Sequence, residues 1–500
     1  MTDAPLPACP APFNLARHVL ARGAETPDRT ALAVLGPDGA EEWSFAALIG
    51  AVRGTATGLL RHGLVPGDIV LMRLGNTPDF PIAYLGAITA GLIPVPTAAA
   101  LTAPEVEKMC RTLAPRAILH DPAVPCPEAE TIDLAALRTM RDLPPADWHM
   151  GDPDRPGYMI YTSGTSGSPM AVVHAHRAIW ARQMMFDGWY GLRAGDRVLH
   201  AGAFNWTYTL GTGLMDPWTV GATALIPAQG TAARDLHGLL ARHEATIFAA
   251  APGVYRQMLA QAAPLDLPRL RHGLSAGEKL PDASRAAWEA ATGTPVYEAF
   301  GMSEISTFIS GSPAHPAPPG TLGRPQPGRV TAILGDDGPL PAGTPGAIAV
   351  HRGDPGLMLG YHGAPEQTEA RFRGEWFVTG DQGVADADGA ITYLGRNDDM
   401  MNAGGFRVSP LEVEAALAEA PGITGVAVTE VTVKAGVSVI AAFYTADAPL
   451  DDASLRAYAE TTLARYKQPR VYVHLPSLPT STNGKLQRRS LRAAYEGQDL

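Results

Sequence analysis

The segment 162–170, which reads TSGTSGSPM, has the composition of a loop that binds phosphate. Backbone N–H groups can surround an anion where glycine permits a close approach, and serine and threonine hydroxyls add further donors. The segment does not match the G-x-x-x-x-G-K-S/T phosphate loop, which disfavours an ordinary nucleoside triphosphatase. Because loops of this composition are also common surface turns, the segment indicates phosphate chemistry only together with other motifs.

Four further segments follow in order along the chain. They read YEAFGMSE at 297–304, VTGDQG at 378–383, GRNDDMMNAGGFRVSP at 395–410 and NGKLQR at 483–488. With the first segment, they resemble in order and spacing the acyl-activating (adenylate-forming) enzymes, which include acyl-CoA synthetases and benzoate-CoA ligases. Two stretches before residue 100, GLVPGDIVLMRLGNTPDF and AITAGLIPVPT, also resemble this family, so the resemblance covers essentially the whole chain.

The resemblance implies a reaction in two steps. A carboxylate attacks the α-phosphate of ATP to give an acyl-adenylate and pyrophosphate, and the thiol of coenzyme A then displaces AMP. Adenylation is needed because a carboxylate lacks a good leaving group. The implied co-substrates are therefore a small carboxylic acid, ATP and coenzyme A, with Mg²⁺ as the implied cofactor.

The resemblance also assigns the groups that act on phosphate and ribose. Glu304 matches a magnesium-binding glutamate, a hard oxygen ligand suited to a cation that bridges phosphates. Asp381 matches the residue that holds the ribose hydroxyls, with Arg396 as a second contact. Lys485 matches a lysine that would neutralise charge between the acyl carboxylate and the α-phosphate. Thr165 is assigned a catalytic role with Glu304 and Lys485.

A larger set of residues is implied for ATP and AMP binding. The loop residues match the segment around the β- and γ-phosphates, and the SAGE and EAF segments match the wall of the adenine pocket. The implied contacts are Thr162, Ser163, Gly164, Thr165, Ser166, Gly167, Gly277, Glu278, Ala299, Phe300, Gly301, Met302, Ser303, Asp381, Arg396 and Asn402.

The segment 395–410 matches the family's connection to its small C-terminal domain. Asp398 stands where the family places the pivot between its two catalytic arrangements. Gly404, Gly405 and Arg407 resemble the segment that meets coenzyme A, where glycines leave a tunnel for the pantetheine arm. The resemblance thus implies a C-terminal domain that acts as a mobile lid.

The stretch AGAFNWTYTLGTGLMDPW at 201–218 matches the part of the family that builds the acyl pocket. Without the family, its aromatic residues would be interpreted as ordinary core residues. The pocket residues implied are Phe204, Trp206, Thr207, Gly277 and Gly301. Acetyl-CoA synthetases carry tryptophan at the place of Gly301, so a glycine favours a medium-chain or aromatic acid over acetate.

One position departs from the family pattern. Family members usually read PKG where this chain has Pro169, Met170 and Ala171, so the ammonium that normally touches the outgoing phosphates is absent. Arg324 or another basic side chain could compensate, or magnesium and the loop amides could suffice. The missing lysine leaves open a nucleotide-binding pseudoenzyme that has lost the chemistry. Independently of it, a ligase that loads an acyl-carrier protein is an alternative within the family.

Composition excludes several other classes of protein. A net charge of −11 argues against a general nucleic-acid binder, and no stretch approaches the roughly 20 apolar residues of a membrane span. Three cysteines, Cys9, Cys110 and Cys126, fit neither a disulfide framework nor a zinc site. The N-terminus resembles no secretory signal, so we expect a cytoplasmic protein. A homodimer is left open.

The pattern of helices and strands predicts how these motifs are positioned. Helical patterns alternate with short apolar runs from about residue 15, which indicates an α/β architecture with parallel-rich sheets layered with helices. Short strands and turns after residue 320 predict a small β-barrel-like section, and the last hundred residues predict an α+β domain. We therefore expect an N-terminal adenylate-forming domain at 1–397 and a C-terminal lid domain at 398–500.

Overall fold

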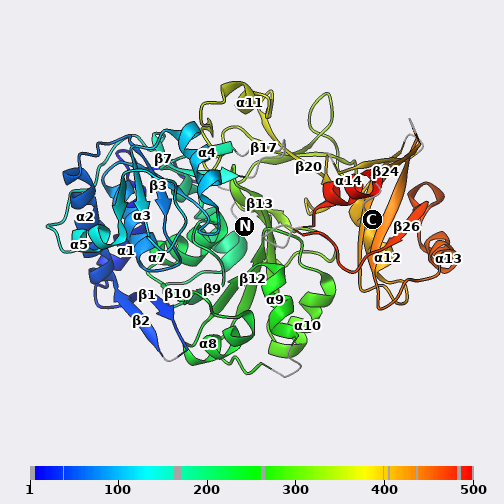
Figure 1. Cartoon of the computed structure of the whole chain (residues 1–500), viewed down its shortest axis with the longest axis horizontal. Helices are drawn as coiled ribbons and strands as arrows, with labels where there is room; N and C mark the ends of the chain where they lie inside the picture. Colours follow the sequence, from blue (N-terminus) through cyan, green and yellow to red (C-terminus); the bar gives the residue numbers. More distant parts are fainter. Residues whose placement is uncertain are drawn as a thin grey trace. The chain divides into compact units, whose positions relative to one another are not determined.

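The computed structural model describes residues 6–37, 39–162, 170–260, 265–397, 399–403, 406–434, 437–480 and 486–497 (Figure 1). The chain divides into two compact units, which are described separately below. The first comprises Met1–Val330 and His351–Phe377, and the second comprises Thr331–Val350 and Val378–Leu500. The domains predicted from the sequence, 1–397 and 398–500, do not coincide with these two units, and they stay a prediction.

The first unit contains a nine-stranded sheet in the order β15-β14-β13-β12-β11-β9-β10-β1-β2. The strands from β1 to β13 in this order are parallel, whereas β2, β14 and β15 are antiparallel to their neighbours. The bounds are β1 (Thr30–Leu35), β2 (Ala40–Ser44), β9 (Arg197–His200), β10 (Thr223–Pro227), β11 (Ile247–Ala250), β12 (His272–Ala276), β13 (Val296–Met302), β14 (Ser306–Ser310) and β15 (Arg324–Pro325). The central strands are continuous apolar runs because both faces of the sheet are covered.

The first unit also contains two smaller sheets, one of which carries the strands on either side of the TSGTSGSPM segment. A parallel sheet has the order β4-β3-β5-β6, and an antiparallel sheet has the order β18-β8-β7. The bounds are β3 (Ile69–Arg73), β4 (Ile93–Pro96), β5 (Ala117–His120), β6 (Thr131–Asp133), β7 (Pro156–Thr162), β8 (Met170–Ala175) and β18 (Gly360–Tyr361). A further short strand, β19 (Phe372–Arg373), belongs to neither of these two sheets.

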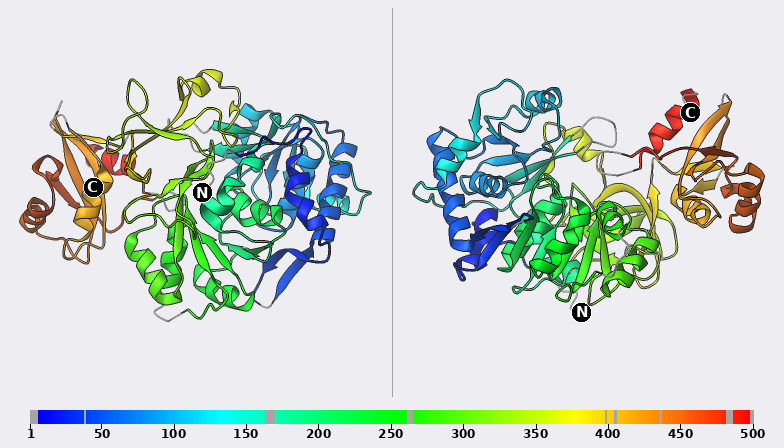
Figure 2. Two further views of the ribbon diagram at one scale, coloured as in Figure 1. Left: turned by 180° about the vertical axis from the view of Figure 1, so that it is seen from behind. Right: turned by 60° about the horizontal axis from the view of Figure 1, so that its bottom comes forward.

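Helices cover these sheets, as Figures 1 and 2 show for the blue to green parts of the chain. Helix α2 begins after Ser44, whose hydroxyl accepts a hydrogen bond from the Ala47 N–H, and the largely apolar α3 is buried on every side. The bounds are α1 (Leu15–Ala24), α2 (Phe45–Arg61), α3 (Asp79–Thr89), α4 (Ala103–Leu113), α5 (Leu134–Met140), α6 (Ala178–Ala181), α7 (Asp216–Thr219), α8 (Leu236–Arg242), α9 (Pro252–Leu259), α10 (Asp282–Thr292) and α11 (Pro365–Glu369).

Two π-helical segments lie beside the nine-stranded sheet. They are η1 (Phe186–Tyr190) and η2 (Thr209–Met215), and η2 runs directly into α7. A π-helix is rare and frequently lies at a functional site. The stretch that matches the family's acyl pocket therefore contains an unusual backbone as well as aromatic residues. A short 3₁₀ turn, η3 (Ala233–Asp235), precedes α8.

The second unit is built around short strands. One sheet has the order β16-β17-β20-β19 with β21 beside β20, and a further sheet has the order β24-β25-β26. The bounds are β16 (Thr331–Leu334), β17 (Gly346–His351), β20 (Trp376–Ala385), β21 (Ile391–Arg396), β22 (Met401–Ala403), β23 (Phe406–Val408), α12 (Pro410–Ala418), β24 (Gly425–Lys434), β25 (Val437–Thr445), α13 (Asp452–Thr462), η4 (Arg465–Lys467), β26 (Val471–His474) and α14 (Arg488–Gly497).

The predicted α/β class is confirmed, since parallel strands alternate with helices in the larger sheets before residue 320. The described strands after it pair mostly in antiparallel fashion, whereas β25 and β26 are parallel. Within the described ranges, none of the helices has the length and hydropathy that crossing a bilayer would require.

Candidate functional site

The TSGTSGSPM segment joins the two strands of an antiparallel hairpin. Strand β7 pairs with β8 so that Thr162 lies opposite Met170 and Tyr161 lies opposite Ala171. The predicted loop residues Ser163, Gly164, Thr165, Ser166 and Gly167 lie outside the described residues, as does the side chain of Thr162. Met170, which stands where the family usually has lysine, is half-buried at the start of β8.

Strand β18, which pairs with β8 of this hairpin, carries the tyrosine that holds Glu304. The Glu304 side chain is buried, and its Oε1 accepts a hydrogen bond of 2.7 Å from the hydroxyl of Tyr361. Tyr361 belongs to β18, where it lies opposite Val172 of β8. The carboxylate predicted to bind magnesium is therefore oriented by the same small sheet that carries the predicted phosphate loop.

A second hydrogen bond joins the same two motifs. His174 of β8 is buried, and its Nε2 donates to the carbonyl oxygen of Ser303 at 2.7 Å. Burial lowers the pKa of His174 to about 4, so the ring stays neutral. Sequence reasoning missed both Tyr361 and His174. The only available signal was the AVVHAH run directly after the loop, which places His174 on the strand that leaves it.

The geometry at Glu304 fits a magnesium ion that also binds phosphate. Its Oε2 accepts no hydrogen bond from the part of the chain that the structure describes. Among the described residues, no group of three or more histidine, cysteine, aspartate or glutamate side chains could enclose a metal by itself. Because Mg²⁺ is commonly bound by one or two carboxylates together with substrate phosphates, a single carboxylate is sufficient on the protein side.

The close packing of two strands gives a structural reason for a glycine at position 301. The pairing of β13 with β14 shifts register between Phe300 and Gly301, and a Cβ at Gly301 would lie 2.3 Å from the carbonyl oxygen of Ser306. The same Cβ would lie 2.5 Å from the Cα of Thr307. The close approach of β14 thus requires a glycine here, and the assignment of Gly301 to the acyl pocket stays a prediction.

Two of the predicted pocket residues are in contact with each other. Gly277 has a φ of 99°, and a Cβ there would lie 2.7 Å from Cζ2 of Trp206. Trp206 and Thr207 are half-buried, which leaves part of each side chain exposed. Phe204, by contrast, is fully buried in the hydrophobic core, where its ring centroid lies 5.4 Å from that of Phe80.

The other residues predicted on this sheet lie at the ends of β12 and β13. Ala299 is buried, and Phe300 packs edge-on against Phe308 with ring centroids 5.4 Å apart. Glu278, Gly301, Met302 and Ser303 are half-buried. Arg324, suggested as a substitute for the missing lysine, lies on β15 opposite Ser310.

In the second unit, Asp381 lies in a buried polar cluster. The hydroxyl of Tyr393 donates to its Oδ1 at 2.9 Å, and the Arg396 guanidinium lies 3.7 Å from its Oδ2. Asp381 and Arg396 are direct partners in the pairing of β20 with β21, so the sheet brings the predicted ribose contact together with the predicted ribose or phosphate contact. Burial and the nearby carboxylate raise the pKa of Tyr393, which keeps it a donor. Sequence reasoning missed Tyr393.

Several predicted residues cannot be placed. Asp398, Gly404, Gly405 and Lys485 lie outside the described residues, as do the side chains of Asn402 and Arg407. The backbones of Asn402 and Arg407 are partners in the pairing of β22 with β23. Their assigned roles in nucleotide and coenzyme A binding stay predictions.

The profile of the AMP-binding enzyme family matches residues 19–362, and that of the AMP-binding enzyme C-terminal domain matches residues 412–485. The chain belongs to the AMP-binding enzyme family. This AMP-binding enzyme is similar to the benzoate-CoA ligase of Thauera aromatica, with 32% identity over 86% of this chain and 87% of the relative. It is also similar to the mitochondrial acyl-coenzyme A synthetase ACSM2 of Rattus norvegicus, with 28% identity over 97% of this chain and 92% of the relative.

A solved structure gives the same result for the fold. The anthranilate CoA ligase AuaEII, in complex with anthranoyl-AMP, superposes with a TM-score of 0.87 at 28% identity, covering 98% of this AMP-binding enzyme and 99% of that chain. The resemblance to adenylate-forming enzymes, inferred from five motifs, is therefore confirmed.

Proposed function

We propose that this protein is an ATP-dependent acid–CoA ligase. It would activate a medium-chain or aromatic carboxylic acid as acyl-AMP and transfer the acyl group to coenzyme A, releasing AMP and pyrophosphate. The observation that carries the proposal is the buried Glu304 carboxylate, which Tyr361 orients from the sheet that bears the predicted phosphate loop. Relatives that are acid–CoA ligases and the match to both family profiles support it.

In this proposal, the first unit binds the triphosphate and the acid. Glu304 would hold Mg²⁺, which when bound neutralises charge on the phosphate oxygens. The hydrogen bond from His174 to the Ser303 carbonyl would keep the GMSE segment fixed against β8 while the nucleotide is bound. Trp206 and Thr207 would line the acyl pocket, and Gly277 would accommodate the indole of Trp206.

The second unit would contribute the ribose contact and the catalytic lysine. Tyr393 and the Arg396 backbone pairing hold Asp381, so its carboxylate is oriented before the ribose hydroxyls arrive. Lys485 would neutralise charge as the acyl carboxylate approaches the α-phosphate. Asp398 would be the pivot of the lid, and Gly404, Gly405 and Arg407 would meet coenzyme A. We also propose a cytoplasmic location and leave open a homodimer.

The substitution of Met170 for the usual lysine favours a second candidate, a nucleotide-binding pseudoenzyme. A third candidate within the family is a ligase that loads an acyl-carrier protein. An assay of pyrophosphate release over a panel of carboxylic acids, run with coenzyme A and then with carrier proteins, separates the three. The proposal expects acid-dependent pyrophosphate release and an acyl-CoA product. ATP binding without pyrophosphate release from any acid would support the pseudoenzyme instead.

A further inference from the structure

A small cavity lies in the first unit, where residues of the predicted acyl and nucleotide segments meet. Its volume is about 10 Å³, and its wall includes Arg182, Thr207, Ser303, Met215 and Ser306. Thr207 belongs to the predicted acyl pocket, and Ser303 belongs to the predicted nucleotide site. This volume corresponds to the space that one water molecule or one hydroxyl group needs, and it is too small for a ring or a methylene chain.

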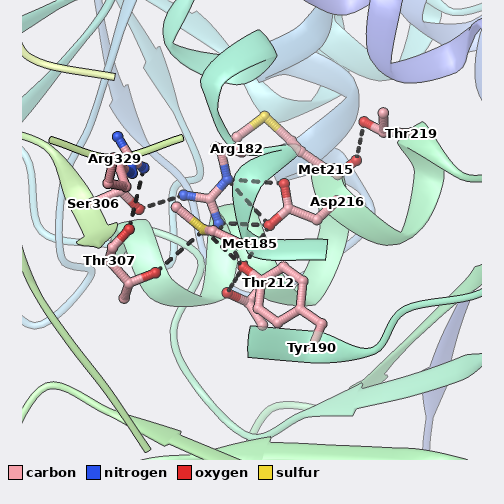
Figure 3. A network of polar contacts seen from close by, with 10 residues as sticks. All are labelled: Arg182, Met185, Tyr190, Thr212, Met215, Asp216, Thr219, Ser306, Thr307 and Arg329. Carbon is pink, nitrogen blue, oxygen red and sulfur yellow. Dashed lines mark hydrogen bonds and ion pairs between the residues drawn. The ribbon is translucent and has the colours of Figure 1, made fainter. Parts of the chain in front are cut away.

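The wall of the cavity contains a buried cation whose charge is already paired. Arg182 donates to Asp216 from Nε at 2.8 Å and from Nη2 at 2.6 Å, and Tyr190 donates to the same carboxylate at 2.8 Å. Figure 3 shows the guanidinium between this carboxylate on one side and Ser306 on the other. Because the Arg182 charge is neutralised, the cavity is not a site for a second carboxylate or a phosphate.

Unpaired hydrogen-bonding groups remain on the side of Ser306. Arg182 Nη1 donates to the Ser306 Oγ at 2.5 Å, whereas the Ser306 hydroxyl proton and the second Nη1 proton have no acceptor among the described residues. His174 also lines the cavity, and because its Nε2 donates to a carbonyl, its buried Nδ1 is an acceptor without a partner among those residues. The wall therefore offers both donors and an acceptor to one small neutral group.

The backbone at Ser306 supports a functional role. Its φ is 70°, in the left-handed region that residues other than glycine rarely adopt. Strain of this kind persists where the surrounding structure fixes it, and such outliers cluster at ligand sites. Gly301 leaves room for the Ser306 carbonyl, because a Cβ at position 301 would lie 2.3 Å from that oxygen.

We infer that this cavity is a subsite for a single hydroxyl group on the acyl substrate, and that Ser306 is the residue that selects for it. The inference rests on the proposed function. A hydroxyl can donate to an acceptor and accept from the Arg182 and Ser306 donors at once, whereas a fluorine or a hydrogen can do neither well. A site built for a hydroxyl leaves polar groups unpaired when the hydroxyl is missing, so it rejects such analogues.

The test compares acids that differ at a single substituent. Benzoate, medium-chain acids, their positional hydroxy isomers and the matching fluoro analogues are assayed for ATP-dependent acyl-CoA formation. For at least one hydroxy isomer, we expect kcat/KM to exceed that of its fluoro and parent partners by about tenfold or more. Ser306→Ala should remove this preference, so that the kcat/KM values of the hydroxy acid and of its parent and fluoro partners converge.

Two further variants make the result specific. Ser306→Gly also removes the hydroxyl but suits the left-handed backbone, so it should show the same loss of preference even if the alanine variant folds poorly. Ser310→Ala is the matched control, because Ser310 is on the same strand but donates to the Gly188 carbonyl, and it should keep the preference. Equal kcat/KM for all hydroxy, fluoro and parent acids would overturn the subsite alone. Turnover of no acid would overturn the subsite together with the proposed function.

Discussion

The substitution Asp216→Asn tests whether the buried Arg182–Asp216 pair stabilises the first unit. The side chains of Arg182 and Asp216 are only 7% and 1% exposed, and the guanidinium packs against Gly211, where a Cβ would lie 2.1 Å from Arg182 Nη2. Burial opposes the charge of Arg182, but the Asp216 carboxylate raises its pKa above the ordinary value. Because an arginine is charged at any ordinary pH, Arg182 stays charged when its partner is removed.

The expected cost follows from that geometry. Removing one member of a buried ion pair leaves the other charge uncompensated, which typically costs about 3–5 kcal/mol. The NH₂ group of the asparagine would also face the N–H groups of Arg182 and the hydroxyl of Tyr190, so that donors would meet donors. We expect Asp216→Asn to lower the free energy of unfolding by this amount, measured by urea denaturation with tryptophan fluorescence.

A double variant and a control make the measurement decisive. Arg182→Met with Asp216→Leu removes both charges and should be more stable than Asp216→Asn, because buried pairs can be replaced by apolar residues at little cost. Glu107→Gln breaks an exposed pair with Arg111 and should change stability by less than about 1 kcal/mol. A cost below about 1 kcal/mol for Asp216→Asn, or a double variant less stable than the single one, would refute the reasoning.

Three other predictions concern the site and its surroundings. Lys485→Ala should slow adenylation by about 10²–10³ while sparing thioester formation from supplied acyl-adenylate, as measured by separate half-reaction assays. Tyr361→Phe removes the hydrogen bond to Glu304 and should raise the Mg²⁺ concentration that gives half-maximal adenylation. Burial lowers the pKa of His200 to about 3, below its unfolded value of about 6.5, so the stability linked to this histidine is complete above pH 6.5 and is lost as pH falls from 6.5 toward 3. In urea titrations below pH 6.5, the unfolding free energy of His200→Leu should therefore fall less steeply with decreasing pH than that of wild type. The difference in slope should be up to about 1.4 kcal/mol per pH unit.

Each of these predictions has a contradicting result. Equal loss in both half-reactions of Lys485→Ala would count against a lysine that acts only in the first step. An unchanged magnesium titration in Tyr361→Phe would show that Tyr361 does not orient the carboxylate. If the unfolding free energy of His200→Leu falls with decreasing pH as steeply as that of wild type, the buried His200 ring does not cause the loss of stability in acid.

The sequence was informative where chemistry is carried by short motifs. The position of Glu304 beside the loop hairpin and the pairing of Asp381 with Arg396 were predictable in outline, because the motif order identifies the family and its fold. The α/β class also followed, since buried parallel strands are recognisable as short apolar runs between helical patterns.

Contacts between distant residues were not predictable. Tyr361 and Glu304 are separated by 57 positions, and Arg182 and Asp216 by 34, with no periodic pattern that links them. Gly301 shows a different limit, because a glycine that makes room for a ligand and a glycine that makes room for a neighbouring strand are identical in sequence. The fold shows the second reason for Gly301, because a Cβ there would meet the Ser306 carbonyl oxygen at 2.3 Å, while its role in the acyl pocket stays a prediction.

The fate of a carboxylate oxygen tests the central claim most directly. When the acid is labelled with oxygen-18 in its carboxylate, attack on the α-phosphate moves one labelled oxygen to phosphorus, and release by coenzyme A leaves that oxygen on AMP. We predict that mass spectrometry of a reaction with ATP, coenzyme A and an accepted acid will find one labelled oxygen in AMP and none in pyrophosphate. Acyl-CoA formation with unlabelled AMP, or with the label in pyrophosphate or phosphate, would contradict the acyl-adenylate mechanism.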